Sequence, residues 1–420
     1  MLVSGPRLRH FCAAQSVVSF RHLLPFTLLL TPLGAQENER AFEAGIDITL
    51  EAGAGVSGGA DTGQHAQALT IAHAAWHGAA AKAGTFSFFA SVLNHAGDGP
   101  TERFLGDFLA ASNIEAYSST RLYAWWLEIA HDDWSLRAGA LLADEEFAGT
   151  DAGGQFCNSI FGWPAFISAN TVNTGPAFFV AAPGVRLEHS LSPAVTARVG
   201  LYDGDTFDSP TGDPTVNPHG WHYRLGGDEG WFAIAELAFA PPASRNRWKL
   251  GIWHHTARFA DVYADASGQP VVVTGGAPRE YSGDTGAYVA FERVLRGERD
   301  QPGFTDFFAR AGAAPADRNT LAWALDTGIA WTGLLAGRPQ DVLALGFAHA
   351  EFSSGFAATA RLLDPAAPRA DFEETIEVCY DVALSDHLTC KPDMQWIRHP
   401  GGSRAQRDAL LVMLRFVADF

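Results

Sequence analysis

Cysteine is scarce in this chain of 420 residues, which contains four, three of them beyond residue 35. Cys157, Cys379 and Cys390 are too few for a disulfide scaffold and lack the CxxC or Cys/His spacing of a metal site. Along a strand, Cys379 shares its parity with Glu377, whereas Cys390 shares that of Met394. Directly opposed residues of a hairpin face the same side of the sheet, so we expect these two cysteines to stay unpaired. The sequence predicts no metal and no other cofactor.

Acidic residues are missing from the N-terminus, where the first is Glu37. Three arginines precede an apolar run at 23–33, and small residues follow it. This order is typical of a secretory signal, so we predict a signal peptide over 1–35 and one mature domain over 36–420. A retained anchor is disfavoured, because prolines interrupt the run and it is too short to span a membrane.

Long apolar runs are absent after residue 35. No stretch there approaches the roughly 18 apolar residues that a membrane-spanning helix needs. A helical membrane protein is therefore excluded. An exported soluble protein and a closed β-barrel remain, because a closed barrel also satisfies every backbone group in lipid.

Charged residues make up only 18 % of the chain, and basic ones are the minority: 29 Lys and Arg against 47 Asp and Glu give a formal charge of −18. Removal of 1–35 removes three arginines, so 26 against 47 leaves −21. Nucleic-acid binding needs a basic face, so we expect no nucleic-acid partner.

Apolar and polar residues alternate with a period of two, which is typical of β-strands. The clearest segments are 46–51, 121–129, 231–240, 248–256, 321–331 and 375–382. One parity is apolar, whereas the other mixes Gly, Ala and isolated charges, unlike a solvated Lys/Glu surface. Aromatic residues near the strand ends fit interfacial girdles; they are Tyr123, Trp248, Trp323, Trp331 and Trp396. We predict an all-β fold, a closed transmembrane antiparallel β-barrel of about 16 strands.

The segment 409–420 alternates almost without a break, with apolar residues at even positions and Arg415 and Asp419 at odd ones. An uncovered edge strand invites aggregation, and closure against the first strand removes that edge. We expect the even positions to face lipid and Arg415 to face passing solute. An edge strand of a soluble sandwich is the alternative for this segment alone.

The longest connection runs from about Phe147 to Pro183 and is rich in Gly, Ala, Asn and aromatic residues. Its aromatic residues argue against disorder. We expect it to fold into the barrel and narrow the channel, or to form a lid in a soluble fold.

Several residue blocks together resemble the carbohydrate-selective porins of the OprB family. They occur in the family's order and spacing: SSTRLYAWWLEI (118–129), SLRAGALLADEEF (135–147), NSIFGWPAF (158–166), TGPAFFVAAPGVRL (174–187), LYDGD (201–205), WKLGIWHHTARF (248–259), the block at 316–353 and KPDMQWIRHPGG (391–402). The likeness covers about 112–420. Ala140, Cys157 and Thr174 depart from the family's usual residues.

The resemblance implies a porin of the Gram-negative outer membrane and not an enzyme. Carbohydrates, chiefly monosaccharides such as glucose, would enter the periplasm by passive, selective diffusion. It also implies contact with outer-membrane lipids, and with the barrel assembly machinery through the C-terminal strand that ends at Phe420. The sugar itself and the choice between monomer and homo-oligomer stay open.

Strand parity directs one set of charges toward the lumen. The set is Glu128, Arg137, Arg186, Arg198, Glu236, Lys249, Glu292, Arg310, Asp326, Glu377, Asp381, Asp393 and Arg415. A sugar carries many hydroxyls and apolar ring faces, so a selective constriction needs charged hydrogen-bonding groups beside aromatic surfaces. Our candidates for the constriction are Glu128, Arg137, Arg186 and Glu236, with Phe161, Trp163 and Trp253. The simpler interpretation is that these charges only hydrate the lumen and pair across strands.

Three motifs fail as catalytic or ligand sites. A GxGxxG at 53–58 follows an alternating strand and lacks a ribose-binding acid at the right distance, so a turn between the first two strands is favoured. His254 and His255 are adjacent and point to opposite faces of a strand, as Glu145 and Glu146 would. We therefore predict no catalytic residues and no metal ligands.

Two other functions compete with a sugar-selective porin. One is a secreted β protein that binds carbohydrate or hydrolyses glycosides, and the other is a purely structural outer-membrane barrel. Solubility without detergent would favour the first, and conductance insensitive to sugars would favour an unspecialised pore.

Overall fold

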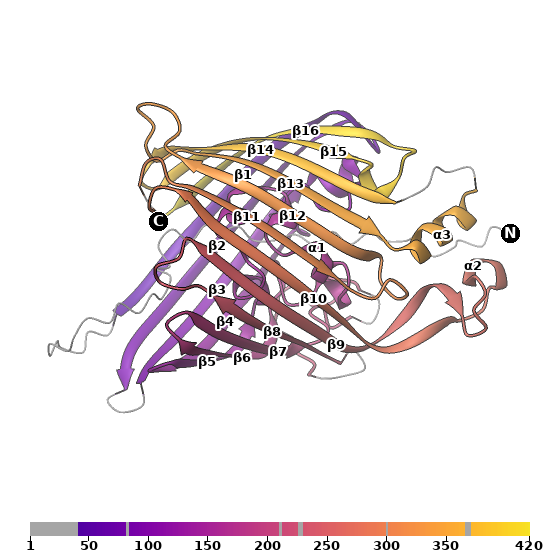
Figure 1. Cartoon of the computed structure of the whole chain (residues 1–420), viewed down its shortest axis with the longest axis horizontal. Helices are drawn as coiled ribbons and strands as arrows, with labels where there is room; N and C mark the ends of the chain where they lie inside the picture. The colour runs from indigo at the N-terminus through magenta and orange to yellow at the C-terminus, as the bar shows by residue number, and fades with distance from the viewer. Residues whose placement is uncertain (1–40, 81–83, 210–211, 226–229, 300, 366–370) are drawn as a thin grey trace.

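The protein folds into one closed β-barrel (Figure 1). The computed structural model describes residues 41–80, 84–209, 212–225, 230–299, 301–365 and 371–420, so the predicted signal peptide lies outside the described residues. Within this part of the chain sixteen strands pair antiparallel with their neighbours in sequence, and β1 pairs with β16. The predicted fold class is confirmed.

The strands are β1 (Ala41–Gly59), β2 (Gly63–Ala80), β3 (Gly84–Asp98), β4 (Ser119–His131), β5 (Trp134–Leu141), β6 (Ala182–Ser192), β7 (Val195–Asp203), β8 (Trp231–Phe239), β9 (Asn246–Asp265), β10 (Pro278–Arg296), β11 (Thr305–Ala313), β12 (Leu321–Thr332), β13 (Val342–Phe352), β14 (Phe372–Ser385), β15 (Leu388–Arg398) and β16 (Arg407–Asp419). The helices are α1 (Ala165–Ser168), α2 (Val271–Thr274) and α3 (Ser354–Leu363), with the short turns η1 (Thr101–Leu105), η2 (Ala143–Glu145), η3 (Ala152–Gln155), η4 (Ser159–Phe161), η5 (Val172–Thr174) and η6 (Pro400–Gly402). No helix in the described ranges is long and apolar enough to cross a membrane.

The two ends of the barrel differ in the length of their connections. At one end two-residue turns at 132–133, 193–194 and 386–387 join neighbouring strands. At the other end lie the long connections 99–118 and 142–181, together with α2 and α3, which Figure 1 places on the right. Unequal ends of this kind are typical of outer-membrane barrels.

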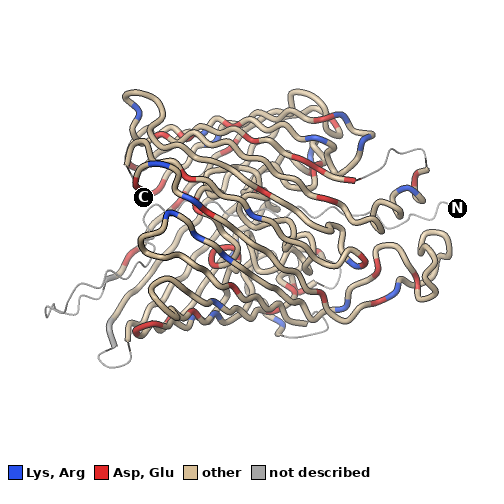
Figure 2. Tube along the Cα trace, viewed as in Figure 1, with Lys and Arg blue, Asp and Glu red and all other residues tan. Residues whose placement is uncertain are grey.

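Burial along β16 gives the direction of its two faces. Leu411 and Arg415 are buried, whereas Val412 and Leu414 are 38 % and 41 % exposed. The even positions therefore face outward and the odd ones inward, as predicted. Figure 2 shows residues of both charge signs distributed along the strands.

One predicted girdle residue faces the other way. Tyr123 is 4 % exposed and its ring meets that of Phe178 edge-on, inside the barrel. The cause is an irregularity in β4, where the register shifts between Ala90 and Val92 of β3 and so changes which face each residue takes. The exposed aromatic residues nearer strand ends, such as Trp248, agree with the prediction.

The glycines at 53–58 lie within β1 and not in the predicted turn. A Cβ on Gly55 would come within 2.7 Å of the Phe104 ring, and one on Gly53 would meet His65 at 2.6 Å. Glycine at position 55 therefore lets η1 approach the wall of the barrel, and glycine at position 53 leaves room for the His65 side chain of β2. The turn itself occupies 60–62.

The three described cysteines are free, as predicted. Cys379 is buried on the inner face, whereas Cys390 lies opposite Val382 and is partly exposed.

Candidate functional site

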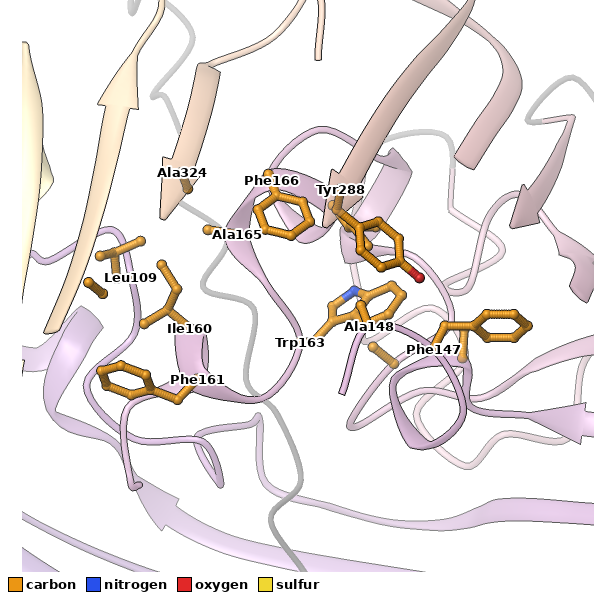
Figure 3. Packing of buried hydrophobic residues seen from close by; sticks show 14 of the residues in the cluster. Leu109, Phe147, Ala148, Ile160, Phe161, Trp163, Ala165, Phe166, Tyr288 and Ala324 are labelled. Atoms are coloured by element: carbon orange, nitrogen blue, oxygen red, sulfur yellow. The ribbon is translucent and has the colours of Figure 1, made fainter. Parts of the chain in front are cut away.

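Two long connections fill much of the barrel interior: loop A (99–118) and loop B (142–181). Trp163, Phe147 and Phe161 of loop B are each 1 % exposed or less. The loop packs against inward side chains of strands β7 to β14, among them Tyr288 (Figure 3). A segment that touches so many strands of a closed sheet lies inside it.

Charged side chains of the wall hold the backbone of loop B. Arg310 donates hydrogen bonds to the carbonyl oxygens of Ala148 (2.6 Å), Ile160 (2.7 Å) and Gly162 (2.7 Å). Asp326 balances its charge at 2.9 Å. Loop backbone in the interior needs such partners, because an unpaired buried peptide group is costly.

Carboxylates supply the matching acceptors. Glu236 accepts from the backbone N–H of Ala148 at 2.8 Å, and Glu377 accepts from that of Asn158 at 3.0 Å. Wall charges of both signs therefore anchor the same loop.

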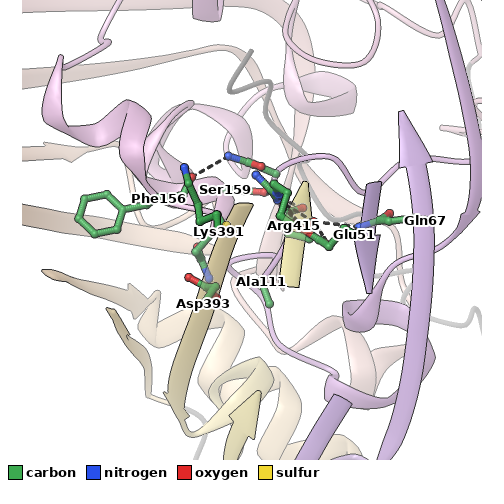
Figure 4. A network of polar contacts seen from close by, with 12 residues as sticks. Glu51, Gln67, Ala111, Phe156, Ser159, Lys391, Asp393 and Arg415 are labelled. Carbon is green, nitrogen blue, oxygen red and sulfur yellow. Dashed lines mark hydrogen bonds and ion pairs between the residues drawn. The ribbon is translucent and has the colours of Figure 1, made fainter. Parts of the chain in front are cut away.

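Loop A is anchored in the same way. Glu373 accepts from the backbone N–H groups of Phe108 (2.7 Å) and Leu109 (2.8 Å), while Gln395 donates to the carbonyl of Ala111 at 2.7 Å. The two loops also bond to each other, from the N–H of Asn113 to the carbonyl of Cys157 at 2.7 Å. They form one inserted unit, and Figure 4 shows part of its polar contact with the wall.

Four charged residues form a closed network that we call the charge ring: Glu128, Arg137, Glu146 and Arg186. Arg137 donates to Glu128 at 3.0 Å and to Glu146 at 2.8 Å, and Arg186 donates to Glu128 at 2.8 Å. Arg186 also pairs with Glu146. Two positive and two negative charges therefore alternate, and the side chains keep 5 % to 18 % of their surface exposed.

Strand register explains why the ring forms. Arg137 of β5 lies directly opposite Glu128 of β4 and Arg186 of β6. Opposed like charges are destabilising, so the two arginines need acids on both sides. Glu146, at the start of loop B, supplies the second acid.

Three predicted candidates belong to the ring, and Glu236 lies apart from them. It accepts a hydrogen bond from the hydroxyl of Tyr288 at 2.7 Å and lies 3.7 Å from Arg198. The sequence predictions do not include Glu146, because they treat Glu145 and Glu146 only as a possible catalytic pair. In the structure Glu145 is exposed while Glu146 turns to the arginines. The facing arginines were the signal that an additional acid was needed.

The three predicted aromatic residues pack loop B against the wall. Phe161, Trp163 and Trp253 are each 1 % exposed. The indole N–H of Trp163 donates to the carbonyl of Thr174 at 3.0 Å. Their faces are covered in this conformation, and their contact with sugar stays a prediction.

Arg415 faces inward, but it does not face passing solute as expected. It is 2 % exposed and pairs with Glu51 at 2.6 Å. Ser112 of loop A donates to the same glutamate at 2.7 Å. Loop A covers Arg415, so the arginine pairs with Glu51 of the barrel wall and is not in contact with the channel.

Loop A contains two carboxyls with raised pKa values. Burial raises the pKa of Glu115 to about 8, helped by the nearby charge of Asp107. Burial likewise raises the pKa of Asp107 to about 6.

Among the described residues, one group of possible metal ligands lies close together: Cys157, Glu377 and Asp393, whose ligand atoms are within 4.8 Å. The positive charges of Lys391 and Arg415 act on Cys157. Nearby cations disfavour a divalent ion, so the group is better explained as part of the loop anchor.

A closed sixteen-strand barrel with an apolar outer face and loops packed into its lumen defines an outer-membrane porin. Residues 71–420 match the family described as "Carbohydrate-selective porin, OprB family". The chain belongs to this family, whose members are channels. It is an outer-membrane porin for the passive diffusion of carbohydrates, and a secreted sugar-binding or hydrolytic protein is not favoured.

Individual proteins are similar to the chain in sequence or in fold. The chain is 25 % identical to Porin B of Pseudomonas aeruginosa over 322 residues, 71 % of this chain and 68 % of that protein. It is similar in fold to the high-pH structure of Pseudomonas putida OprB, with a TM-score of 0.78, 19 % identity and coverage of 90 % and 94 % of the two chains. The outer membrane channel DcaP of Acinetobacter baumannii gives 0.56, with 13 % identity and coverage of 91 % and 97 %.

Proposed function

We propose that the charge ring is the contact at which the channel selects neutral sugars of monosaccharide size, such as glucose. The single observation that carries the proposal is its balanced charge: Glu128 and Glu146 each bind both arginines. Because its charges sum to zero, the ring favours neither anions nor cations. It still presents strong hydrogen-bonding groups, which suit a neutral solute that is rich in hydroxyls.

Sugar hydroxyls can exchange with the ring's own contacts. Guanidinium groups only donate hydrogen bonds and ionised carboxylates only accept them, whereas a hydroxyl does both. Each charge in the ring has two counter-charges, so a hydroxyl can replace one contact while the other persists. The ring then binds a sugar without leaving a bare buried charge, which would cost several kcal/mol.

The two inserted loops support a small solute. Loop B supplies Glu146 to the ring, and loop A packs against loop B through Asn113. Both occupy lumen that an unobstructed sixteen-strand barrel would leave to water. Passage beside them favours a single sugar unit over longer chains.

Conductance across planar bilayers, titrated with glucose and with a disaccharide, tests the proposal. Arg137→Gln and Glu128→Gln should each raise the half-inhibiting glucose concentration about tenfold, because a charge-assisted hydrogen bond contributes about 1.5 kcal/mol or more. Arg258→Gln is the matched control, since this arginine of β9 has a side chain that is 79 % exposed and lies outside the charge ring. Unchanged glucose inhibition in both ring variants, with normally assembled barrels, would overturn the proposal.

We also propose that outer-membrane lipids surround the barrel and that the assembly machinery recognises its C-terminal strand. Outward residues such as Leu414 support the first point, and Phe420 supports the second, since its side chain is 70 % exposed beyond β16. Phe420→Ser should slow assembly in cells while leaving refolding in detergent unchanged. Normal assembly rates would contradict the second point.

A further inference from the structure

A stack of planar groups lies beside the charge ring on the inner wall. The ring of Phe89 on β3 stacks on the indole of Trp126 on β4, with centroids 5.2 Å apart and an interplanar angle of 15°. The guanidinium carbon of Arg137 on β5 lies 3.9 Å from the Trp126 ring centroid. His73 extends the stack, at 6.2 Å from Phe89.

Strand register again sets the arrangement. Phe89 and Trp126 are directly opposed in β3 and β4, and the residue opposite Trp126 in β5 is Gly139. A residue two positions away on a strand shares the same face, so Arg137 lies on the inner face with Gly139. A Cβ on Gly139 would lie 2.1 Å from the carbonyl oxygen of Trp125, so glycine at this position lets β5 approach the backbone of β4 beside Trp126.

The stack completes the restraint on Arg137. Glu128 and Glu146 hold the edge of its guanidinium plane, and Trp126 holds its face. An arginine side chain has many rotamers, and fixing it in one of them costs conformational entropy. Contacts that already hold Arg137 in place reduce the entropy that is lost when a sugar binds. Of the two ring arginines, Arg137 is the more exposed, at 18 % against 5 % for Arg186, and so the better placed to meet a solute.

We propose that Trp126 is a positioning residue for sugar selection, which holds the Arg137 guanidinium so that its free N–H groups face the passing sugar. The inference rests on the proposed function of the charge ring. Trp126 acts through Arg137, because β3 and β5 flank β4 on opposite sides and the indole lies between Phe89 and the guanidinium. Its faces are thus occupied by protein groups and not by sugar.

The test compares glucose inhibition of bilayer conductance in Trp126→Ala and Trp126→Phe. Loss of a cation–π contact should raise the half-inhibiting glucose concentration about 2- to 30-fold in Trp126→Ala. Trp126→Phe keeps an aromatic face and should recover most of the affinity. Trp396→Ala removes an outward indole that is 38 % exposed and should leave inhibition unchanged.

A double-mutant cycle with Arg137→Gln separates the outcomes. If Trp126 acts through Arg137, adding Trp126→Ala to Arg137→Gln should cause no further loss. Additive losses would overturn the inference, since Trp126 would then contact sugar itself. Full affinity in Trp126→Ala, with reduced affinity in Arg137→Gln, would also overturn it while the proposed function stands. Full affinity in Arg137→Gln would overturn the inference as well, and full affinity in both Arg137→Gln and Glu128→Gln would overturn the proposed function. If Trp126→Ala does not fold, Trp126→Phe can replace it in the cycle with Arg137→Gln, because phenylalanine retains the packing against Phe89.

Discussion

Arg415 of β16 pairs with Glu51 of β1 at 2.6 Å, across the seam where the last strand of the barrel meets the first. The two residues are directly opposed in the register and both are buried. Ser112 of loop A bonds to the same glutamate, so one carboxylate joins the seam to an inserted loop. The ion pair therefore couples closure of the barrel to the position of loop A.

Removal of one partner should weaken the seam. Arg415→Leu leaves Glu51 buried without its counter-charge, which should cost about 3 to 5 kcal/mol. When samples are heated to increasing temperatures before gel electrophoresis, the temperature at which the band of the folded barrel disappears should fall. Addition of Glu51→Leu should recover part of the loss, because two apolar residues need no counter-charge. An equal or larger loss in the double variant would contradict this account.

A charge on the outer face should block assembly. Leu414 is 41 % exposed and adjoins the middle of β16, so Leu414→Arg should cost about 2 to 4 kcal/mol in the bilayer. Leu414→Met is the control. Folding yield in lipid vesicles measures the difference, and equal yields would mean that this face does not meet lipid.

Release of loop B should change the channel. Arg310→Met removes the donor to Ala148, Ile160 and Gly162 together. We expect higher conductance and weaker inhibition by glucose, because the loop that carries Glu146 loses its anchor. Addition of Asp326→Leu removes the unpaired acid, so the loop effect can be measured in a stable barrel. Unchanged conductance in the double variant would show that other contacts suffice.

The position of loop A should depend on pH through Glu115. Its pKa in the folded protein, about 8, lies above the usual glutamate value, so the folded form favours the protonated acid. This contribution to stability is fully present below about pH 4.5 and is lost as pH rises through about 8. Protease cleavage within loop A should increase between pH 6 and pH 9.

Glu115→Gln should abolish that increase, because a neutral amide mimics the protonated acid. Glu102→Gln, at an exposed position of the same loop, should retain it. Equal pH dependence in Glu115→Gln and the unaltered protein would assign the effect to another group.

Much of the fold could be predicted because alternation is a local property. A period of two fixes which residues share a face, and the family blocks indicate which face points inward. The sequence therefore predicts the inward set from Glu128 to Arg415. The prediction for Tyr123 is wrong because the register of β4 against β3 shifts, and only strand pairing reveals such a shift.

The sequence by itself determined the alternating strand segments, which of their faces points outward, and the porin family. Only the tertiary structure decided which inward charges stay in the channel and which anchor loops. Glu377 binds the backbone of Cys157, 220 residues away, and Arg310 binds that of Ala148, 162 residues away. Such contacts depend on how a loop folds back inside a closed sheet, and alternation along a strand carries no information about that path. For the same reason the sequence does not predict that Glu146 belongs to the charge ring, or that Arg415 pairs with Glu51 at the seam and does not face the channel.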